Sequence, residues 1–258
     1  MNNIAITFEN KKNNVLSIYF TAGYPKLTDT IKILEILQDA GADMVEIGMP
    51  FSDPLADGPV IQNSSTVALK NGMSIQELFD QLHGMRTKIT MPVILMGYYN
   101  PVFKYGVENF CKSAAKVGID GLIIPDLPID EYLANKPIFD KYGLCNILLI
   151  TPQTTDERIK QIDNIASGFI YAVSSYATTG SGKALNLSAQ YFEKLKNTAF
   201  NNPVMIGFGI KDKATFDNAC QYANGAIIGT EFIKLLEKYG ADKTKITEFI
   251  KGVKGNDQ

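Results

Sequence analysis

One apolar stretch of the chain contains a carboxylate placed where it could transfer protons. Residues 43–48 read DMVEIG, so that Glu46 interrupts a strand-like run of apolar side chains. Side chains alternate along a strand, which puts Val45 and Ile47 on one face and Glu46 on the other. If the β-branched pair packs on helices, Glu46 points inward, where burial raises the pKa of a carboxyl group and suits it to acid or base catalysis. The alternative is a structural glutamate bonded to polar neighbours.

Two further carboxylates, Asp53 and Asp57, lie in the loop MPFSDPLADGP (49–59) that directly follows. Turn chemistry alone can account for Asp-Pro and Asp-Gly pairs. The position of the loop, directly after a strand with a buried glutamate, favours Asp57 as a second functional acid. Two carboxylates in different environments can hold different protonation states and so divide the acid and base roles.

A phosphate site is indicated by glycines near the end of the chain. The stretches 207–210 (GFGI) and 225–229 (GAIIG) each end a strand-like run, and Thr230 opens the helix that follows. Glycines let the backbone approach oxygen atoms closely, and helix N-termini attract anions. The alternative is that tight turns alone require these glycines. Residues 180–183 (GSGK), in a long loop expected at 174–186, could fold over the site as a lid.

Other residue types are scarce, and their scarcity narrows the chemistry. The two arginines, Arg86 and Arg158, and the only histidine, His83, all lie in helix-like stretches. A histidine-based triad or metal site is therefore not expected, and phosphate must be held mainly by backbone N–H groups. No expected strand carries a lysine near its end, which argues against a Schiff-base lyase. A phosphate-bearing substrate handled by carboxylates, without a metal, is what remains.

The elements that must position these residues alternate along the whole chain. Eight strand candidates are separated by amphipathic segments with helical spacing, which predicts parallel βαβ units. The strand candidates are 15–20, 43–48, 92–97, 121–126, 144–150, 168–173, 203–208 and 225–229. Eight such units predict an α/β fold, a closed (β/α)₈ TIM barrel formed as one domain by residues 1–258. An open doubly wound sheet is the rival, but the first strand runs into TAGYP and lacks its glycine fingerprint.

Several helices can be anticipated beyond the regular repeat. Residues 1–12 read as an extra N-terminal helix, and two helices, at 60–71 and 74–88, are expected after the second strand. Thr28, Thr155 and Ser188 precede apolar periodic segments and predict helix starts. A terminal helix is expected within 242–258.

Composition excludes several classes of function. The 258 residues include 25 basic and 27 acidic side chains, so no basic surface suggests nucleic acid or an anionic membrane. No run of apolar residues is long enough to cross a bilayer, and the N-terminus does not read as a signal peptide. The three cysteines are widely spaced and predict neither disulfides nor zinc. A cytoplasmic location fits these features.

Several of these segments together resemble one known family. The run AGADMVEIGMPFSDPLADGPVIQ (40–62) is similar to the signature of the tryptophan synthase alpha subunit. The similarity extends through YFTAGYP (19–25), MGYYNP (96–101), IIPDLP (123–128), ATTG (177–180), GFGI (207–210) and AIIGT (226–230). The resemblance implies a lyase of tryptophan biosynthesis that cleaves indole-3-glycerol phosphate into indole and glyceraldehyde 3-phosphate.

The same resemblance implies roles for individual residues. Glu46 matches the catalytic glutamate, and Asp57 matches the aspartate that pairs with the indole N–H. Positions that contact the substrate are Tyr171, Tyr19, Met96, Phe208 and Thr179, and Thr179 closes against the catalytic aspartate. Phosphate-binding positions are Gly180, Gly209, Gly229 and Thr230.

The family also implies a partner. Its members work with a beta subunit in an α2β2 heterotetramer, and the pyridoxal phosphate of the complex belongs to that subunit, so no cofactor is expected in this chain. Pro50, Asp53 and Asn100 match loops that face the partner. Two positions depart from the pattern: Ser175 replaces an arginine found in many members, and Tyr19 replaces a commoner phenylalanine.

Two other functions stay open at this point. The chain could be a regulatory subunit that activates a beta partner with little chemistry of its own, and Ser175 leaves room for that. It could also be another phosphosugar enzyme, an isomerase or epimerase, although such an enzyme does not explain the loop at 49–59.

Overall fold

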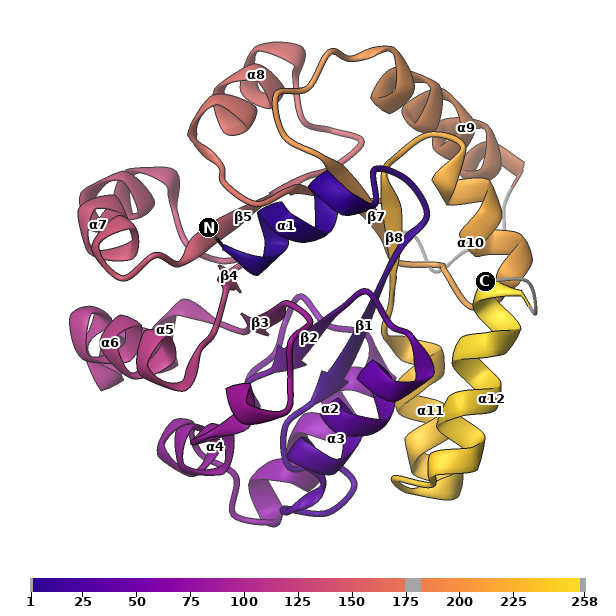
Figure 1. Ribbon diagram of the computed structural model, residues 1–258. Coiled ribbons are helices and arrows are strands. Elements are labelled where there is room, and N and C mark those ends of the chain that lie inside the picture. Colours follow the sequence, from indigo (N-terminus) through magenta and orange to yellow (C-terminus); the bar gives the residue numbers. More distant parts are fainter. Residues whose placement is uncertain (1, 175–181, 256–258) are drawn as a thin grey trace.

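The strands of this protein close into a ring in which each pairs with its neighbours in the chain. The computed structural model describes residues 2–174 and 182–255, apart from the side chains of 182–188. The strands are β1 (Val15–Thr21), β2 (Met44–Gly48), β3 (Val93–Met96), β4 (Gly121–Ile123), β5 (Cys145–Ile150), β6 (Ile170–Val173), β7 (Val204–Gly207) and β8 (Gly225–Ile228). All pair in parallel, and β1 pairs with β8, so that Val15 faces Gly225 and the barrel is closed (Figure 1). The predicted (β/α)₈ barrel is confirmed, and the open sheet is excluded.

Helices surround the ring and follow the strands in the expected alternation (Figure 1). They are α1 (Asn3–Asn10), α2 (Asp29–Ala40), α3 (Pro59–Lys70), α4 (Ile75–Leu82), α5 (Tyr99–Tyr105), α6 (Val107–Val117), α7 (Ile129–Lys141), α8 (Asp156–Ile165), α9 (Gly182–Asn197), α10 (Lys213–Cys220), α11 (Thr230–Tyr239) and α12 (Lys243–Lys254), with a 3₁₀ turn at Met85–Thr87. The extra helix before β1, the additional helix after β2 and the terminal helix are confirmed. None of the helices in the described part of the chain has the length and apolar character needed to cross a membrane.

Predicted helix starts had mixed outcomes. Thr155 caps α8, because its hydroxyl accepts the N–H of Arg158, and Thr28 stands at the start of α2 without a side-chain bond. The start predicted at Ser188 is wrong: α9 begins at Gly182, inside the expected loop 174–186. Gly, Ser and Thr made the segment look like a loop, yet the alanine and leucines of KALNL favour a helix.

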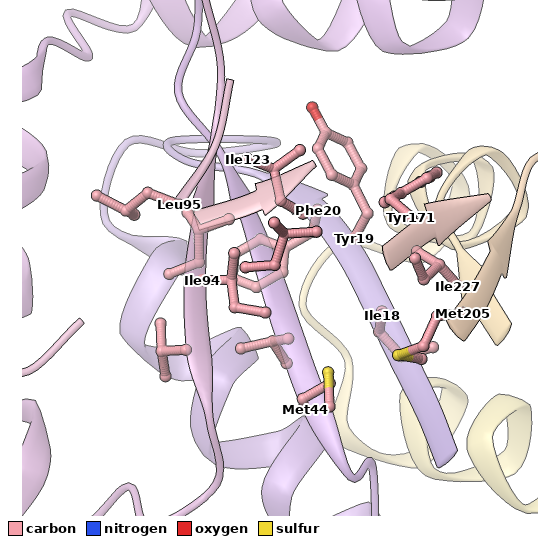
Figure 2. Packing of buried hydrophobic residues seen from close by; sticks show 14 of the residues in the cluster. Ile18, Tyr19, Phe20, Met44, Ile94, Leu95, Ile123, Tyr171, Met205 and Ile227 are labelled. Carbon is pink, nitrogen blue, oxygen red and sulfur yellow. The ribbon is translucent and has the colours of Figure 1, made fainter. Parts of the chain in front are cut away.

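The strand register decides which side chains fill the barrel. Residues paired across parallel strands point to the same side, so Tyr19 and its partner Glu46 share the inner face. The same register turns Ile94, Tyr171, Met205 and Ile227 inward, and the close view in Figure 2 shows several of these side chains packed between the strands. The interior is therefore a packed core with one carboxylate on its wall.

Helix α1 closes the end of the barrel at which the strands begin. It lies across the opening of the ring in Figure 1, and its Ile4 is fully buried. A Cβ on Gly121 would come within 3.0 Å of the Ile4 side chain, and one on Gly168 would also touch it. Phe8 adds a tilted contact with Phe169 at 6.2 Å between ring centroids. The helix thus seals the floor beneath the inward-pointing residues.

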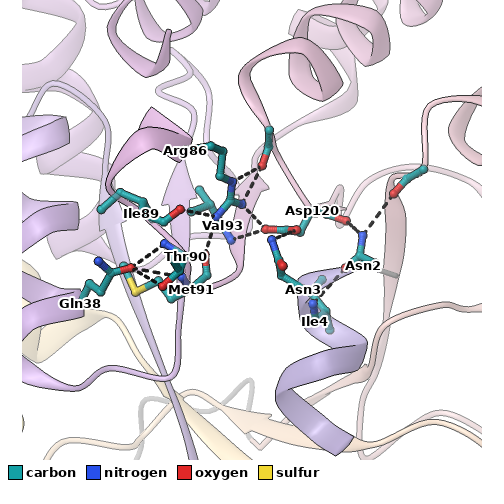
Figure 3. A network of polar contacts seen from close by, with 12 residues as sticks. Asn2, Asn3, Ile4, Gln38, Arg86, Ile89, Thr90, Met91, Val93 and Asp120 are labelled. Carbon is teal, nitrogen blue, oxygen red and sulfur yellow. Dashed lines mark hydrogen bonds and ion pairs between the residues drawn. The ribbon is translucent and has the colours of Figure 1, made fainter. Parts of the chain in front are cut away.

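A partly buried ion pair between Asp120 and Arg86 stabilises this same end of the barrel (Figure 3). The carboxylate of Asp120, directly before β4, pairs with Arg86, accepts the N–H of Val93 at 2.8 Å and accepts the amide of Asn3 at 2.9 Å. Arg86 also donates to the carbonyl oxygens of Gly118 and Met91. One aspartate therefore joins α1, the start of β3 and the turn after α4.

Replacing Asp120 with alanine should destabilise the fold by about 3 kcal/mol, because the loss of one partner leaves a partly buried guanidinium and a backbone N–H without their acceptor. Urea denaturation followed by circular dichroism measures the change. Asp140→Ala is the matched control, because Asp140 makes only an exposed pair with Lys136 on α7 and should cost less than about 0.5 kcal/mol. Equal losses of stability in the two variants would contradict the stabilising role given to Asp120.

Candidate active site

A cavity opens at the end of the barrel where the strands finish. Its volume is about 890 Å³. Its walls come from the residues after β2, β3, β4 and β7 and from the ends of β1, β5 and β6. Among the predicted site residues it is lined by Tyr19, Asp57, Met96, Phe208 and Gly209. Active sites of such barrels occupy this end.

Glu46 lies on the inner wall of the barrel and, like Tyr171, is not part of the cavity lining. Its side chain is fully buried, and its Oε1 accepts a hydrogen bond from the Ser17 hydroxyl on β1 at 3.0 Å. Its Oε2 has no hydrogen-bond partner among the described residues. Burial raises the pKa of Glu46 to about 8, and the bond from Ser17 opposes part of that rise. The expected inward orientation and raised pKa are both found, and Glu46 is protonated at neutral pH.

Asp57 lies in the loop between β2 and α3, one residue before the helix cap Gly58. Its Oδ2 accepts the hydroxyl of Tyr98 at 3.1 Å, and the oxygen of that hydroxyl accepts the N–H of Ala56 at 2.9 Å. Gln62 on α3 holds the same loop by donating to the carbonyl oxygens of Pro54 and Asp57. Burial raises the pKa of Asp57 to about 6, and the Tyr98 bond opposes it. Asp57 is therefore mostly ionised at neutral pH.

Glu46 and Asp57 both raise the pKa values of the same two tyrosines. Burial raises the pKa of Tyr171 well above its usual value, and the negative charges of Glu46 and Asp57 add to the rise. Burial likewise raises the pKa of Tyr19, with Asp57 as the larger of the two carboxylate contributions. Glu46 and Asp57 thus converge on one region, the first as a neutral acid and the second as an anion.

Glycines make room for both tyrosines. A Cβ on Gly48 would overlap the Tyr19 hydroxyl, and a Cβ on Gly207 would overlap the Tyr171 hydroxyl. Figure 2 shows the Tyr19 ring standing beside Tyr171, with its hydroxyl turned away from the aliphatic side chains of the core. The Tyr19 hydroxyl therefore lies over β2 and the Tyr171 hydroxyl over β7, and of the two rings Tyr19 lines the cavity.

The turn after β7 supplies another wall. Phe208 and Gly209 both have left-handed backbone, with φ of 69° and 76°, a conformation that costs energy for a bulky residue such as phenylalanine. Ser174 holds the turn by donating its hydroxyl to the Phe208 carbonyl oxygen at 2.6 Å. The Phe208 ring meets Tyr171 edge-on at 6.3 Å. This strain places an aromatic ring at the cavity rim.

The other predicted site residues do not line the cavity, and some of them lie outside the part of the chain that the structure describes. Gly229 caps α11, and a Cβ there would lie 3.3 Å from the Tyr19 ring, so it backs the cavity wall, while Thr230 is exposed at the start of the helix. Asp53 and Asn100 are exposed and Pro50 is half-buried. Ser175, Thr179 and Gly180 lie outside the described residues, and so does the first half of the predicted lid at 180–183, whose second half is the start of α9.

Sequence reasoning missed three polar residues here. Ser17 and Tyr98 bond to the two acids, and Asp126 lines the cavity and accepts the N–H of Tyr99 at the start of α5. Ser17 could have been noticed as a polar residue two positions before Tyr19, on the same face of the strand. Within the described residues, no three His, Cys, Asp or Glu side chains gather in a way that could hold a metal.

The comparison with protein families decides what kind of site this is. The family model described as "Tryptophan synthase alpha chain" matches residues 6–256. The chain belongs to the tryptophan synthase alpha chain family. It is accordingly a lyase of tryptophan biosynthesis that cleaves indole-3-glycerol phosphate, as the resemblance implied.

Individual members of the family agree over nearly the whole length. The tryptophan synthase alpha chain of Flavobacterium johnsoniae is 55% identical over 252 residues, which cover 97% of this chain and 98% of that one. The alpha chain of Flavobacterium psychrophilum is 54% identical, with 94% and 95% covered. The crystal structure of tryptophan synthase subunit alpha from Legionella pneumophila superposes with a TM-score of 0.87 at 34% identity, with 98% and 97% covered.

Glu46→Gln should become more stable relative to the wild type as the pH rises. The pKa of Glu46 is about 8 in the folded chain against 4.5 as the ordinary value, so its contribution to stability is complete below pH 4.5 and is lost as the pH rises through 8. Glutamine does not titrate, and the stability difference should therefore shift by about 4 kcal/mol between pH 4.5 and pH 8. Urea denaturation at several pH values measures it.

The control is Glu193→Gln, which changes an exposed side chain on α9. Its stability curve should run parallel to that of the wild type. A parallel curve for Glu46→Gln as well would mean that this carboxyl group is not held in an apolar interior.

Proposed function

We propose that Glu46 and Asp57 carry out the cleavage of indole-3-glycerol phosphate, Glu46 as the proton-transferring group and Asp57 as the stabilising anion. The observation that carries this proposal is the different placement of the two acids: Glu46 is fully buried in the barrel, whereas Asp57 lines the cavity. Burial accordingly raises the pKa of Glu46 to about 8 and that of Asp57 only to about 6, which leaves the first protonated and the second ionised at neutral pH. Two acids held in opposite states can supply a proton and stabilise a cation in the same step.

Substrate binding follows from the walls of the cavity. The flat indole ring fits between Tyr19, Met96 and Phe208, with Tyr171 beneath it. In this pose the Asp57 carboxylate accepts the ring N–H. The phosphate lies on the side of β7 and β8, held by backbone N–H groups at Gly209, Gly229 and Thr230, and by Gly180. Thr179 closes against Asp57 once the substrate is bound.

The reaction needs one proton to enter and one to leave. Glu46 gives its proton to C3 of the indole ring, and the positive charge that appears on the ring nitrogen is stabilised by Asp57. The bond between C3 and the hydroxyl-bearing carbon then breaks, and its electron pair restores the neutral aromatic ring. The hydroxyl proton returns to Glu46 as the carbonyl group of glyceraldehyde 3-phosphate forms. Glu46 ends the cycle in its starting state, and the ring serves as the electron sink.

We further propose that the chain works in the cytoplasm with a tryptophan synthase beta subunit in an α2β2 complex, and that the pyridoxal phosphate belongs to that subunit. Two apolar side chains support a partner at the cavity end of the barrel. Leu55, in the loop after β2, is 90% exposed, and Phe103 on α5 is 64% exposed. They belong to the same loop and helix as Asp53 and Asn100, and exposed apolar groups of this kind mark interaction surfaces.

Asp57→Asn and Glu46→Gln should each lower the rate of indole release by at least about 100-fold, because each removes a charge or a proton that the reaction needs. In the wild type, release should be greatest between about pH 6 and 8, falling below the Asp57 pKa and above the Glu46 pKa. The assay follows indole released from indole-3-glycerol phosphate by the purified chain, with and without a beta subunit.

The same assay separates the two other functions considered from the sequence. A purely regulatory subunit releases no indole in either condition, although it activates the beta subunit. An isomerase or epimerase leaves the substrate intact and instead binds other phosphosugars in a thermal-shift panel. Turnover like the wild type in either carboxylate variant would overturn the roles given to Glu46 and Asp57.

Phe103→Asp should weaken association with the beta subunit by about 100-fold or more, because a charge replaces an apolar contact at the proposed interface. Calorimetric titration of one purified subunit with the other measures the affinity. Tyr239→Asp is the control, because Tyr239 is a comparably large exposed side chain at the end of α11, outside the loops that carry the cavity. Unchanged affinity in Phe103→Asp, or an equal loss in both variants, would contradict this placement of the partner.

A further inference from the structure

One hydroxyl group inside the barrel contacts the proposed catalytic acid without reaching the cavity. Ser17 lies on β1, is fully buried and is not part of the cavity lining. It pairs with Met44 across the strands, one inward position before the pair of Tyr19 with Glu46. From there its Oγ donates to Oε1 of Glu46 at 3.0 Å. Ser17 therefore approaches Glu46 from the floor of the barrel.

The two oxygens of Glu46 consequently have different surroundings. Oε1 accepts the Ser17 hydroxyl, whereas Oε2 is buried and has no partner among the described residues. The titratable groups that share this region are Tyr19 on β1, Tyr171 on β6 and Asp57 after β2, and the neighbour on β3 is the apolar Ile94. An oxygen that accepts a hydrogen bond is the less favourable place for the acid proton. The proton of the neutral acid thus belongs on Oε2.

We propose that Ser17 is a positioning residue, which fixes Glu46 so that Oε2 carries and receives the proton exchanged with the substrate. The inference rests on the proposed role of Glu46. While Glu46 is neutral, Ser17 holds Oε1 as the acceptor. When Oε2 has given up its proton, the same hydroxyl donates to a carboxylate, and a hydrogen bond to an ionised group is the stronger one. Ser17 thereby stabilises Glu46 in the charged state through which each turnover passes.

A merely structural role for Ser17 makes a different prediction. A buried hydroxyl requires an acceptor, and Glu46 could be only that. In that case the loss of the hydroxyl would lower stability and shift the titration of Glu46, but kcat at the optimal pH would remain that of the wild type. The value of kcat therefore distinguishes the two roles, and the titration of the carboxyl group shows that the bond acts on Glu46.

The experiment compares the wild type, Ser17→Ala and Ser17→Thr. In Ser17→Ala we expect the alkaline limb of indole release to move up by about one pH unit, because the bond from Ser17 lowers the pKa of Glu46. We expect kcat to fall about tenfold with KM changed less than about twofold, because the acid is less well held but the cavity walls are intact. Ser17→Thr keeps the hydroxyl and should restore both properties.

A second measurement does not depend on activity or on how threonine packs. The ¹³C resonance of the Glu46 carboxyl group, assigned with Glu46→Gln, is followed over pH in labelled protein. Its titration should move upward in Ser17→Ala. Ser167→Ala is the matched control: it removes a hydroxyl that accepts the N–H of Asn146 at the opposite end of the barrel, and should leave the titration and the alkaline limb unchanged.

The outcomes separate this inference from the proposed function. If the resonance and the alkaline limb of Ser17→Ala coincide with those of the wild type, the positioning role is overturned, even where stability falls. If the wild type releases no indole, or Glu46→Gln releases it equally well, the proposed function fails, and the positioning role fails with it even where the carboxyl titration shifts. A shift of both limb and resonance together with a lower kcat, all restored by Ser17→Thr, supports the inference, whereas the same shift with kcat unchanged overturns the positioning role.

Discussion

The burial of one carboxyl group inside an apolar barrel is the constraint on which the site depends. Moving Glu46 out of water disfavours its charged form, and among the described residues the Ser17 hydroxyl offsets part of that cost. The fold tolerates the group because it can hold a proton, which is the property that makes it useful. The closed ring of strands keeps water away from Glu46, which is fully buried and is not part of the cavity lining.

Asp57 depends on a different kind of support. It comes from a loop, and the loop is fixed by bonds to Tyr98 and Gln62 from two separate elements. Its carboxylate therefore keeps contact with the cavity and loses less hydration than Glu46. Because one acid lies on a rigid strand and the other on a hydrogen-bonded loop, their pKa values can be set independently, although both face the same substrate region.

The sequence predicts the barrel and the inward direction of Glu46, because strand alternation and the repeat of βαβ units are local properties. It does not predict that Ser17 and Tyr98 bond to the two acids, since such contacts depend on the register between strands and on loop conformation. The start of α9 at Gly182 was missed for a related reason: residue composition could not tell a glycine-containing helix from a loop. The roles of the glycines near the phosphate depend on a ligand and stay predictions.

The packing of α1 against the start of the strands also affects the pKa of Glu46. Ile4 and Phe8 close the floor of the barrel, and the bonds of Asn2 and Asn3 around Asp120 hold the helix there. If this plug were loosened, solvent could enter the barrel from below and hydrate the Glu46 carboxylate. Its pKa would then fall toward that of an ordinary glutamate. A helix that covers the start of the strands thus helps to set the proton affinity of an acid inside the barrel.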